Sequence, residues 1–510
     1  MPGFLDNASP GVMKGLSAAV LAALFAIFIA MSVTAPTGPI TGEGEDLSTI
    51  NTGDTAWMLI SSAIVLMMCP GIAFFYGGMV QSKNVVSTIM QAFLPLAIIP
   101  VMWSIVGFGL AFGESVPGSA GILGNPADLG GLMYKVGAAP LASLAATIPL
   151  SLFFVFQMVF AVVTPAIIIG SVADRVNVSS LCIFIALWHI IVYCPIAHMV
   201  WHPSGIIRVF GVLDYAGGTV VHMSSGFAGV AAAKYLGHSL ASAGRRDMAA
   251  GSSSGSSSEG HVFWWENPEP ANVPIVVLGT TLLWVGWFGF NAGSALGAGA
   301  MASHVFMTTN AAAGTAMLGW LLMDQLRGHK IRATGACIGA VIGLVAITPA
   351  AGFVNYGSAA LIGMIGAITC ALVQEAMDRF GKKYLDDTLD VWACHGVGGT
   401  VGMICTALFT TTSVNPAGAQ GAFYGNPLLL GKTLLVLVIV VPWFLVATWG
   451  CLWLTDKIMC IRVSDLEEMQ GLDISKHGER AVSELVHIEA IAKEASMHGA
   501  KSEKADMQCV

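Results

Sequence analysis

Two histidines lie inside long apolar, glycine-rich stretches of the sequence. His395 occurs in DVWACHGVGG, residues 390 to 399, and His222 ends DYAGGTVVH, residues 214 to 222. An imidazole in hydrocarbon is costly unless it is paired or faces a cavity. Each ring nitrogen of an imidazole can donate or accept a hydrogen bond, depending on where its proton lies. The two residues therefore indicate a polar site in apolar surroundings, although a lone buried histidine is as often bonded to a backbone carbonyl.

The chain has 12 histidines, of which four fall inside predicted membrane spans and not at a span's first or last residue. We interpret two of these, His189 and His198, as structural. The other two could also ligate a haem iron, but no CxxCH motif occurs and no span carries two histidines at a suitable spacing. An electron carrier or membrane enzyme is therefore the weaker interpretation, and we expect no cofactor and no metal.

Aromatic side chains form a second group near one predicted membrane face. Rings at helical spacing usually pack in a core. A ring that faces a vestibule instead attracts a small cation through its quadrupole, by roughly 0.5–2 kcal/mol. Several such rings near one face favour a cation-attracting entrance, which would be formed by Phe156 and Phe160 in FFVFQMVF, Trp201 in AHMVW, and Trp287, Phe290 and Ser294 in WVGWFGFNAGSAL.

A carboxylate opens each of the two histidine segments. Asp214 precedes His222 and Asp390 precedes His395. At the head of a helix a carboxylate accepts backbone N–H groups, whereas a buried carboxylate can stabilise a positive charge before deprotonation. We give capping the larger share at Asp214, and either role predicts that its substitution is severe.

Eleven apolar runs are long enough to span a bilayer, which takes about 20 residues. They predict an all-α polytopic membrane protein, with spans near 54 to 80, 87 to 112, 147 to 170, 179 to 200, 214 to 238, 273 to 297, 304 to 325, 332 to 351, 357 to 378, 390 to 411 and 432 to 460.

The two histidine segments echo one another, and each lies in the last helix of a set of five. Because five is odd, two consecutive sets of five helices have opposite orientations. The sequence thus predicts an inverted repeat of five plus five helices with one further helix, an architecture whose sites lie at the midplane between the halves.

Positive charge is distributed unevenly between the connections. One side carries 13 Lys and Arg residues and the other carries only Lys135, Arg208 and Lys432. The positive-inside rule then places the start of the first core helix outside and the C-terminus in the cytoplasm. We expect a membrane domain over residues 51–461 and a cytoplasmic tail over residues 462–510.

Three segments lie outside this core. In the N-terminal extension, residues 1–50, the apolar run 16–33 is either a signal peptide or a twelfth helix. Pro36 makes a poor cleavage junction for a signal peptide. We nevertheless favour cleavage or a loosely attached segment. The Gly/Ser-rich stretch near 241–260 predicts a flexible cytoplasmic linker. Residues 479–496 have the apolar spacing of a short helix.

Composition excludes several functional classes. The 510 residues are 55% hydrophobic and 10% charged, with a formal charge of −8 and no basic stripe, so nucleic acid is not expected as a partner. The mean hydropathy is +0.76. None of the ten cysteines forms a CxxC pair, so neither a disulfide framework nor a zinc site is indicated.

Six motifs together resemble the ammonium transporter family (Amt, Mep and Rh proteins), and the Amt branch most closely. The resemblance runs from about residue 51 to residue 482. The motifs are FYGGMVQSKNV, PIAHMVW, DYAGGTVVHMSSGFAG, GWFGFNAGSAL, DDTLDVWACHGVGGTVG and GLDISKHGERAV.

The resemblance implies a homotrimer with a hydrophobic pore through each subunit. Trp201, Phe160 and Ser294 would match the outer ammonium-recruitment site. Phe160 and Phe290 would match a phenyl gate, Asp214 the buried carboxylate, and His222 with His395 the paired pore imidazoles. The supporting positions would be Phe156, Gln157, Trp287, Asn291 and Asp390.

These implications predict a plasma-membrane ammonium transporter and no enzyme. Moving a bare ion into a dry pore costs tens of kcal/mol in the Born limit, so the ion would shed its proton and cross as ammonia. The alternative is an ammonium sensor that signals through its tail, and a Rhesus-type gas channel is less similar. A PII-type signal protein or a kinase is expected at the cytoplasmic face.

Three positions depart from the family pattern. Asp174 stands where Glu is usual, Gln81 where a basic residue is common, and Val482 where Tyr is usual. We expect none of them to contact the pore, and Val482 puts a tail switch in doubt.

Overall fold

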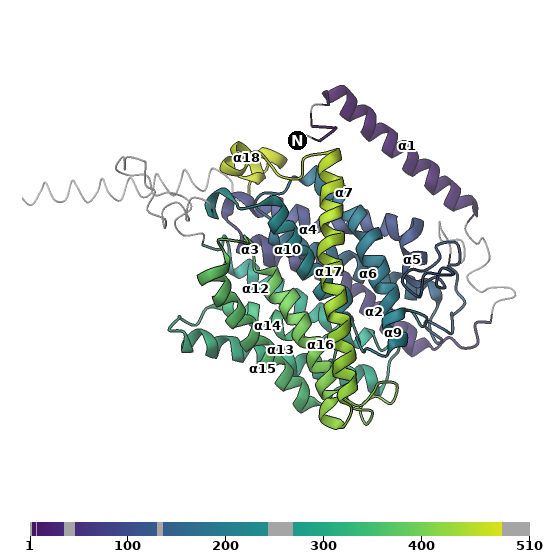
Figure 1. The fold of residues 1–510 in the computed structure, drawn as a ribbon. Coiled ribbons are helices and arrows are strands. Elements are labelled where there is room, and N and C mark those ends of the chain that lie inside the picture. The colour runs from purple at the N-terminus through teal and green to yellow at the C-terminus, as the bar shows by residue number, and fades with distance from the viewer. Residues whose placement is uncertain (1–2, 7, 35–45, 130–135, 243–268, 482–510) are drawn as a thin grey trace, which may run out of the picture.

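The computed structural model describes residues 3–6, 8–34, 46–129, 136–242 and 269–481 (Figure 1). Within these residues, ten helices are long and apolar enough to cross a membrane, and one of the ten is the N-terminal helix over Gly11–Val33. The helix Ala333–Ile347 is apolar but shorter. The predicted linker near 241–260 and the predicted helix over 479–496 fall almost entirely outside the described residues, as does Val482.

The first half of the bundle contains five spans, four of which contain a break or a π-helical turn. The segments, in chain order, are α2 (Thr52–Leu66) with α3 (Met68–Met79); the short η1 (Ser82–Asn84), α4 (Val85–Met102), η2 (Trp103–Gly107) and α5 (Phe108–Phe112); α6 (Leu150–Ile168) with η4 (Ile169–Ser171); α7 (Val178–Trp188), η5 (His189–Tyr193) and α8 (Cys194–Trp201), followed by the short α9 (Ile206–Phe210); and η6 (Gly218–Met223) with α10 (Ser224–Leu236).

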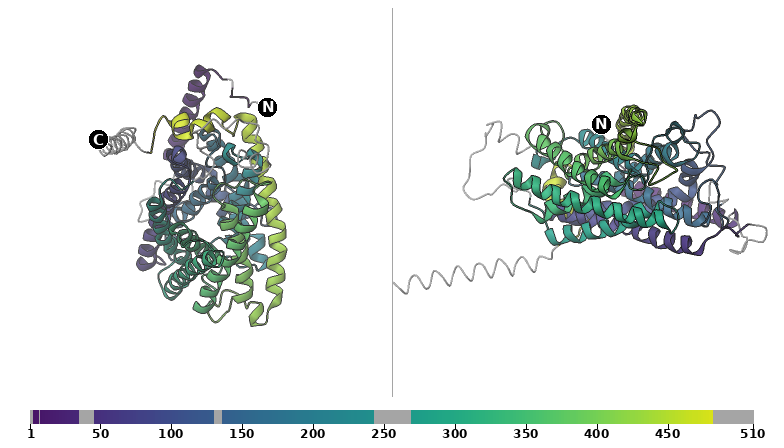
Figure 2. Two further views of the ribbon diagram at one scale, coloured as in Figure 1. Left: turned by 90° about the vertical axis from the view of Figure 1, so that its left-hand side faces the viewer. Right: turned by 90° about the horizontal axis from the view of Figure 1, so that it is seen from below.

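The second half repeats this count and is followed by one long helix. Its segments are α12 (Val273–Trp287) with η7 (Phe288–Ala292); α13 (Ala300–Leu326); α14 (Ala333–Ile347); α15 (Tyr356–Ala376) with η8 (Met377–Gly381); η9 (Trp392–Val397) with α16 (Gly398–Phe409); the turn η10 (Ala422–Tyr424); and α17 (Pro427–Ile458). Each of the eleven predicted spans therefore coincides with a helical segment, which confirms the all-α membrane fold. Figure 2 shows α17 along the edge of the bundle.

Asparagine begins four of the spans. Asn51, Asn177, Asn272 and Asn355 each accept a backbone N–H from the first turn of α2, α7, α12 and α15. A short polar side chain at this position satisfies one of the free N–H groups of a helix start. The span boundaries are thus set by local chemistry as well as by the length of the apolar runs.

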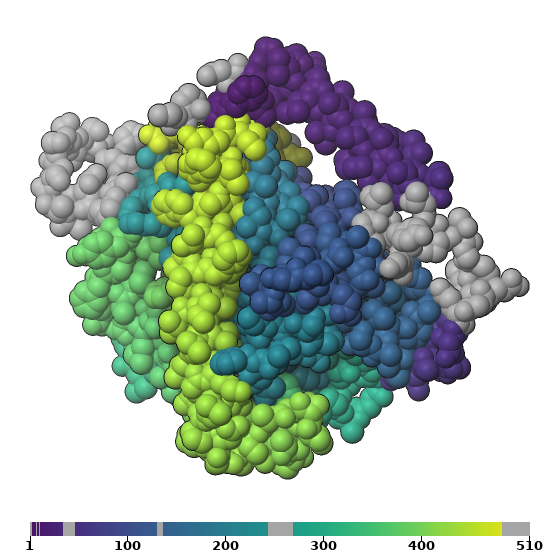
Figure 3. Space-filling view, turned by 45° about the vertical axis from the view of Figure 1, so that its right-hand side comes forward, coloured from purple at the N-terminus to yellow at the C-terminus, as the bar shows by residue number. Residues whose placement is uncertain are grey.

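The N-terminal helix α1 (Pro10–Thr34) stands apart from the bundle (Figure 3). Its apolar 18-residue window is not buried at all. Just before it, the N–H groups of Phe4 and Leu5 donate to the carbonyls of Lys457 and Ile458 at the end of α17.

The tail packs against the start of α4. It contains α18 (Asp465–Gln470), which begins with a capping box at Ser464, and η11 (Asp473–His477). Asp473 accepts the N–H of Ser87 at 2.8 Å, and the N–H of Leu472 donates to Asn84 at 2.9 Å. Residues of the C-terminal tail therefore form hydrogen bonds with polar groups at the start of α4.

Candidate functional site

The two histidines from the glycine-rich segments meet inside the bundle. Their Nδ1 atoms lie 3.2 Å apart, and only 1% of His222 and 6% of His395 is exposed. Each imidazole lies in a π-helical turn, η6 or η9, at the start of its span. π-Helical turns are rare and occur frequently at functional sites. The sequence echo thus corresponds to one paired site built from both halves.

A column of rings covers His222 on the predicted outer side. The ring centroids of Phe160 and Phe290 are 4.2 Å apart, and those of Phe290 and His222 are 6.0 Å apart. Trp201 packs edge-on against Phe160 at 5.6 Å, and Trp287 stacks on His222 at 5.3 Å. The rings predicted from separate segments therefore form one continuous stack that ends at the histidine pair.

The remaining predicted residues lie around this stack. The rings of Phe156 and Phe160 are 5.0 Å apart, and the hydroxyl of Ser294 donates to the carbonyl of Phe290 at 2.8 Å. Asn291 donates to Thr309 at 3.1 Å. Gln157 is buried, and its side-chain carbonyl oxygen has no hydrogen-bond partner.

Asp214 is a helix cap. Its two carboxylate oxygens accept the N–H groups of Gly217, Gly218 and Thr219 at 2.7–2.8 Å, and 9% of the residue is exposed. Three charge-assisted bonds at one helix start satisfy three N–H groups that otherwise lack partners. The capping role that we favoured is the one that the geometry supports.

The partner of Asp214 in the repeat is Asp387, which the sequence analysis missed. Asp387 accepts the N–H of Trp392 at the start of η9, and it lies eight residues before His395, as Asp214 lies eight residues before His222. Pairing Asp214 with Asp390 was wrong by three residues. Asp390 instead has a φ of 54° and accepts from Gln374 at 2.7 Å. The shared spacing of eight would have identified Asp387.

A close crossing of the two halves allows the histidines to meet. A Cβ built on Gly226 of α10 would overlap the backbone N and Cα of Gly396 in η9. Only a hydrogen atom fits between these backbones, so the glycine at 226 is required by close approach. The glycine-rich sequence beside each histidine thus has a structural purpose.

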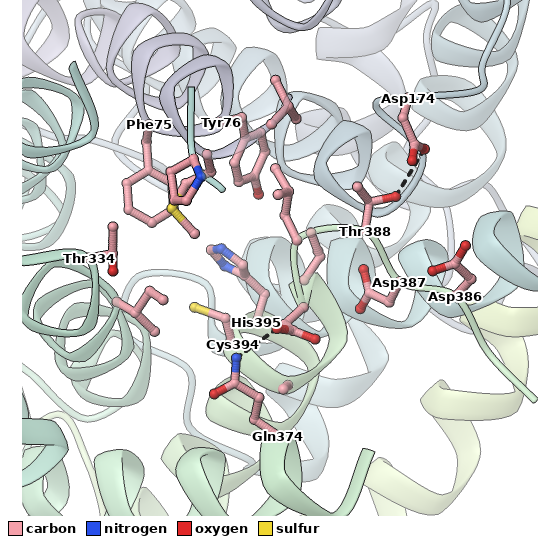
Figure 4. A pocket seen from close by; sticks show the side chains of 18 of the residues that line it. Phe75, Tyr76, Asp174, Thr334, Gln374, Asp386, Asp387, Thr388, Cys394 and His395 are labelled. Atoms are coloured by element: carbon pink, nitrogen blue, oxygen red, sulfur yellow. Dashed lines mark hydrogen bonds between the residues drawn. The ribbon is translucent and has the colours of Figure 1, made fainter. Parts of the chain in front are cut away.

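Two cavities adjoin the histidine pair. A cavity of about 20 Å³ has an almost entirely apolar lining and touches both imidazoles. A larger one of about 390 Å³ opens from His395 toward the predicted cytoplasmic side and is lined by Gln374, Cys394 and Asp387 among others (Figure 4). Asp174 and Gln81 also line this cavity, so two of the three departures from the family pattern lie along the cavity that reaches His395.

The ammonium transporter family model matches residues 56–482. The chain belongs to the ammonium transporter family. Members of this family are transporters, which agrees with the expectation of a multi-pass membrane protein that carries ammonium. The match covers every helix from α3 to α18 and includes all the site residues described above.

Individual relatives cover most of the chain. An ammonium transporter of Bacillus subtilis is 42% identical over 431 residues, which is 84% of this chain and 98% of the relative. A putative ammonium transporter of Methanothermobacter thermautotrophicus is 41% identical over 84% of this chain and 98% of the relative. The crystal structure of Saccharomyces cerevisiae Mep2 is similar with a TM-score of 0.73 and 33% identity, over 84% of this chain and 92% of Mep2.

Proposed function

We propose that the protein captures ammonium at its outer end, removes the proton and conducts ammonia past His222 and His395. The observation that carries this proposal is the buried Nδ1–Nδ1 contact of 3.2 Å beneath the Phe160–Phe290 pair. Ammonium in an apolar passage would lose its hydration without an ion partner, at a cost of tens of kcal/mol in the Born limit. Ammonia is neutral, so its entry costs only the hydrogen bonds that it loses with water.

The outer end has the chemistry to hold the ion before it is deprotonated. Trp201 and Phe160 offer ring faces, each contributing roughly 0.5–2 kcal/mol toward a cation. Since the hydroxyl hydrogen of Ser294 is donated to Phe290, its oxygen lone pairs are directed to other donors, such as the N–H groups of ammonium. The family and the positive-inside rule support this face as the outer side of the plasma membrane, with the tail in the cytoplasm.

Selectivity follows from the proton. A potassium ion has the same charge and a similar size but no proton to lose, so it would have to enter the ring stack as a bare cation. The Phe160 and Phe290 rings are in contact, with centroids 4.2 Å apart and planes tilted by 34°, so ammonia passes only when one ring turns aside. We therefore propose that the rings and the histidines act in series, first as a barrier to ions and then as a path for ammonia.

The test is the current that ammonium evokes in proteoliposomes. Removing both imidazoles, in His222→Ala with His395→Ala, is expected to abolish proton-coupled current or to admit potassium. His304→Ala is a matched control, because the Nε2 of His304 bonds to the Val354 carbonyl at 2.9 Å, away from the ring stack. A double variant that carries the wild-type current with unchanged selectivity would show that the histidines are not the path.

A further inference from the structure

Four polar side chains at the outer end of α8 form an unbroken chain of hydrogen bonds. Ser115 Oγ lies 2.8 Å from His198 Nε2 and 2.7 Å from Ser204 Oγ, which lies 2.8 Å from His202 Nδ1. We call these four residues the outer imidazole chain. His198 is fully buried and His202 retains 2% exposure, and their rings stack at 4.6 Å. The pore described above uses neither of them.

The first bond of the chain fixes the direction of the others. His198 Nδ1 lies 3.0 Å from the carbonyl of Ala111, and a carbonyl only accepts, so Nδ1 carries hydrogen. In a neutral His198 the Nε2 atom must then accept from Ser115. Ser115 in turn accepts from Ser204, and Ser204 accepts from the Nδ1–H of His202.

This neutral arrangement leaves one contact unsatisfied. The backbone N–H of Ser204 points at His202 Nδ1 at 3.2 Å, but Nδ1 already carries hydrogen and cannot accept. A donor that faces another donor forgoes its hydrogen bond. The neutral outer imidazole chain is therefore one acceptor short.

One added proton gives every contact a donor that faces an acceptor. When a proton binds His202 Nε2, the Nδ1 hydrogen passes to Ser204, the Ser204 hydrogen to Ser115, and the Ser115 hydrogen to His198 Nε2. Each hydroxyl oxygen loses one hydrogen and gains one, so only the position of the charge changes. His202 ends neutral with a bare Nδ1 whose lone pair accepts from both the hydroxyl and the backbone N–H of Ser204, and His198 becomes an imidazolium.

Packing keeps the heavy atoms in place while the hydrogens move. A Cβ built on Gly205, beside Ser204, would overlap the carbonyl oxygens of His198 and Met199. The turn is therefore held directly against α8. Protonation is answered by the transfer of three hydrogens along the chain rather than by movement of the backbone.

The hydrogen bonds favour His198 as the resting place of the proton, because both of its ring nitrogens can then donate, one to the Ala111 carbonyl and the other to Ser115. Burial disfavours the positive charge on both imidazoles; Glu114 favours it at His198, and at His202 Arg208 opposes it while Asp128 favours it. The two imidazoles also repel each other's charge, so the chain holds one added proton. Arg208 additionally donates to the carbonyl of Trp201 at 2.6 Å.

The geometry points to a proton-binding site that weakens ammonium capture in acidic medium. His198 lies three residues before Trp201, about one helical turn away. An imidazolium there repels a cation held against the Trp201 ring. The inference rests on the proposed function, because it assumes that Trp201 helps to hold ammonium, and it adds a regulation of that site by external pH.

The test compares the KM for ammonium near pH 5 and pH 7.5 in proteoliposomes. In the wild type we expect KM to rise about threefold to tenfold at the lower pH, with Vmax little changed, as like charges about 10 Å apart would produce. His198→Gln and Ser115→Ala should both keep the neutral-pH KM. Ser115→Ala retains both imidazoles, so it tests the inference even if His198→Gln does not fold.

His304→Gln, another histidine on the outer side, should follow the wild-type profile. Equal pH profiles of KM in wild type, His198→Gln and Ser115→Ala would overturn the inference, as would an equal flattening in His304→Gln. Calorimetric binding of ammonium to the detergent-solubilised protein separates this outcome from failure of the transport proposal. If the dissociation constant for ammonium rises at low pH in the wild type but not in His198→Gln or Ser115→Ala, the proton-binding site is supported even where no ammonium current is recorded.

Discussion

The bond between His222 and His395 limits the pair to two neutral arrangements. Since one Nδ1 must donate and the other accept, one imidazole presents a bare Nε2 and the other an Nε2–H. Ammonia can donate to the first and accept from the second. Exchange between the arrangements moves one hydrogen across the 3.2 Å contact, while the bare Nε2 takes up a proton and the Nε2–H of the other ring releases one. Under the proposed function, a proton could therefore cross the pair in the same direction as ammonia.

Asp214 provides the first prediction at the scale of single residues. Replacing it with Ala removes the acceptors of three backbone N–H groups. Each N–H left unpaired costs about 1–3 kcal/mol when it stays dry, so we expect a large loss of thermal stability. Asp214→Asn keeps one accepting oxygen and should lose less. Both are measured by thermal unfolding in detergent beside uptake per folded transporter.

Asn51 is the matched control, because it caps α2 with a single bond at an exposed position. Asn51→Ala should cost about 1 kcal/mol and leave uptake unchanged. If Asp214→Asn were as stable as the wild type and yet did not transport, the negative charge rather than the cap would be the function of Asp214.

At the scale of elements, the sequence predicts the spans well and their internal turns poorly. Length and apolarity locate all eleven spans because a bilayer demands both. The π-helical turns η6 and η9, which direct the histidines, depend on backbone contacts between the two halves. Asp387 was missed for a related reason: the turn from 387 to 392 places its carboxylate against η9, whereas Asp390 follows the more obvious sequence echo.

The crossing of α10 and η9 gives the second prediction. Gly226→Ala places a methyl group against the backbone of Gly396, and such overpacking typically costs about 1–3 kcal/mol. The helices must separate, which lengthens the contact between the histidines. We expect ammonium current per folded transporter to fall about tenfold, equivalent to about 1.4 kcal/mol in the barrier.

Gly450→Ala on α17 is the control for this substitution, since an added Cβ there meets nothing within 4 Å. It should fold and transport as the wild type does. A Gly226→Ala protein with full current would mean that the histidines need not be held at their present distance.

At the scale of the whole molecule, one buried arginine joins segments from both halves and the tail. Arg175 donates to Asp174 and Thr388 at 2.7 Å, to the Gly237 carbonyl at 3.0 Å and to the Asp386 carbonyl. Its own carbonyl accepts the N–H of Val463 at 3.0 Å. The sequence shows Arg175 only as one positive charge among 13 on its side of the membrane, because its partners lie up to 288 residues away in the chain.

This cluster gives the last prediction, a dependence of stability on pH. Burial opposes the charge of Asp386, but Arg175 and the hydrogen bonds from Ser239 outweigh burial and lower the pKa of its carboxyl. An acid whose pKa is lower in the folded state stabilises the fold above its unfolded pKa of about 3.9. That contribution is lost as the pH falls through the folded pKa.

Asp386→Asn should therefore be less stable than the wild type at neutral pH, by about 1.5–3 kcal/mol, and the difference should shrink below about pH 4. Thermal unfolding in detergent across that range measures it. Asp378→Asn is the control: Asp378 pairs with Lys382 at an exposed site, where an ion pair contributes about 0–1 kcal/mol. A constant difference between Asp386→Asn and wild type at every pH would mean that the hydrogen bonds of Asp386, and not its charge, hold the two halves together.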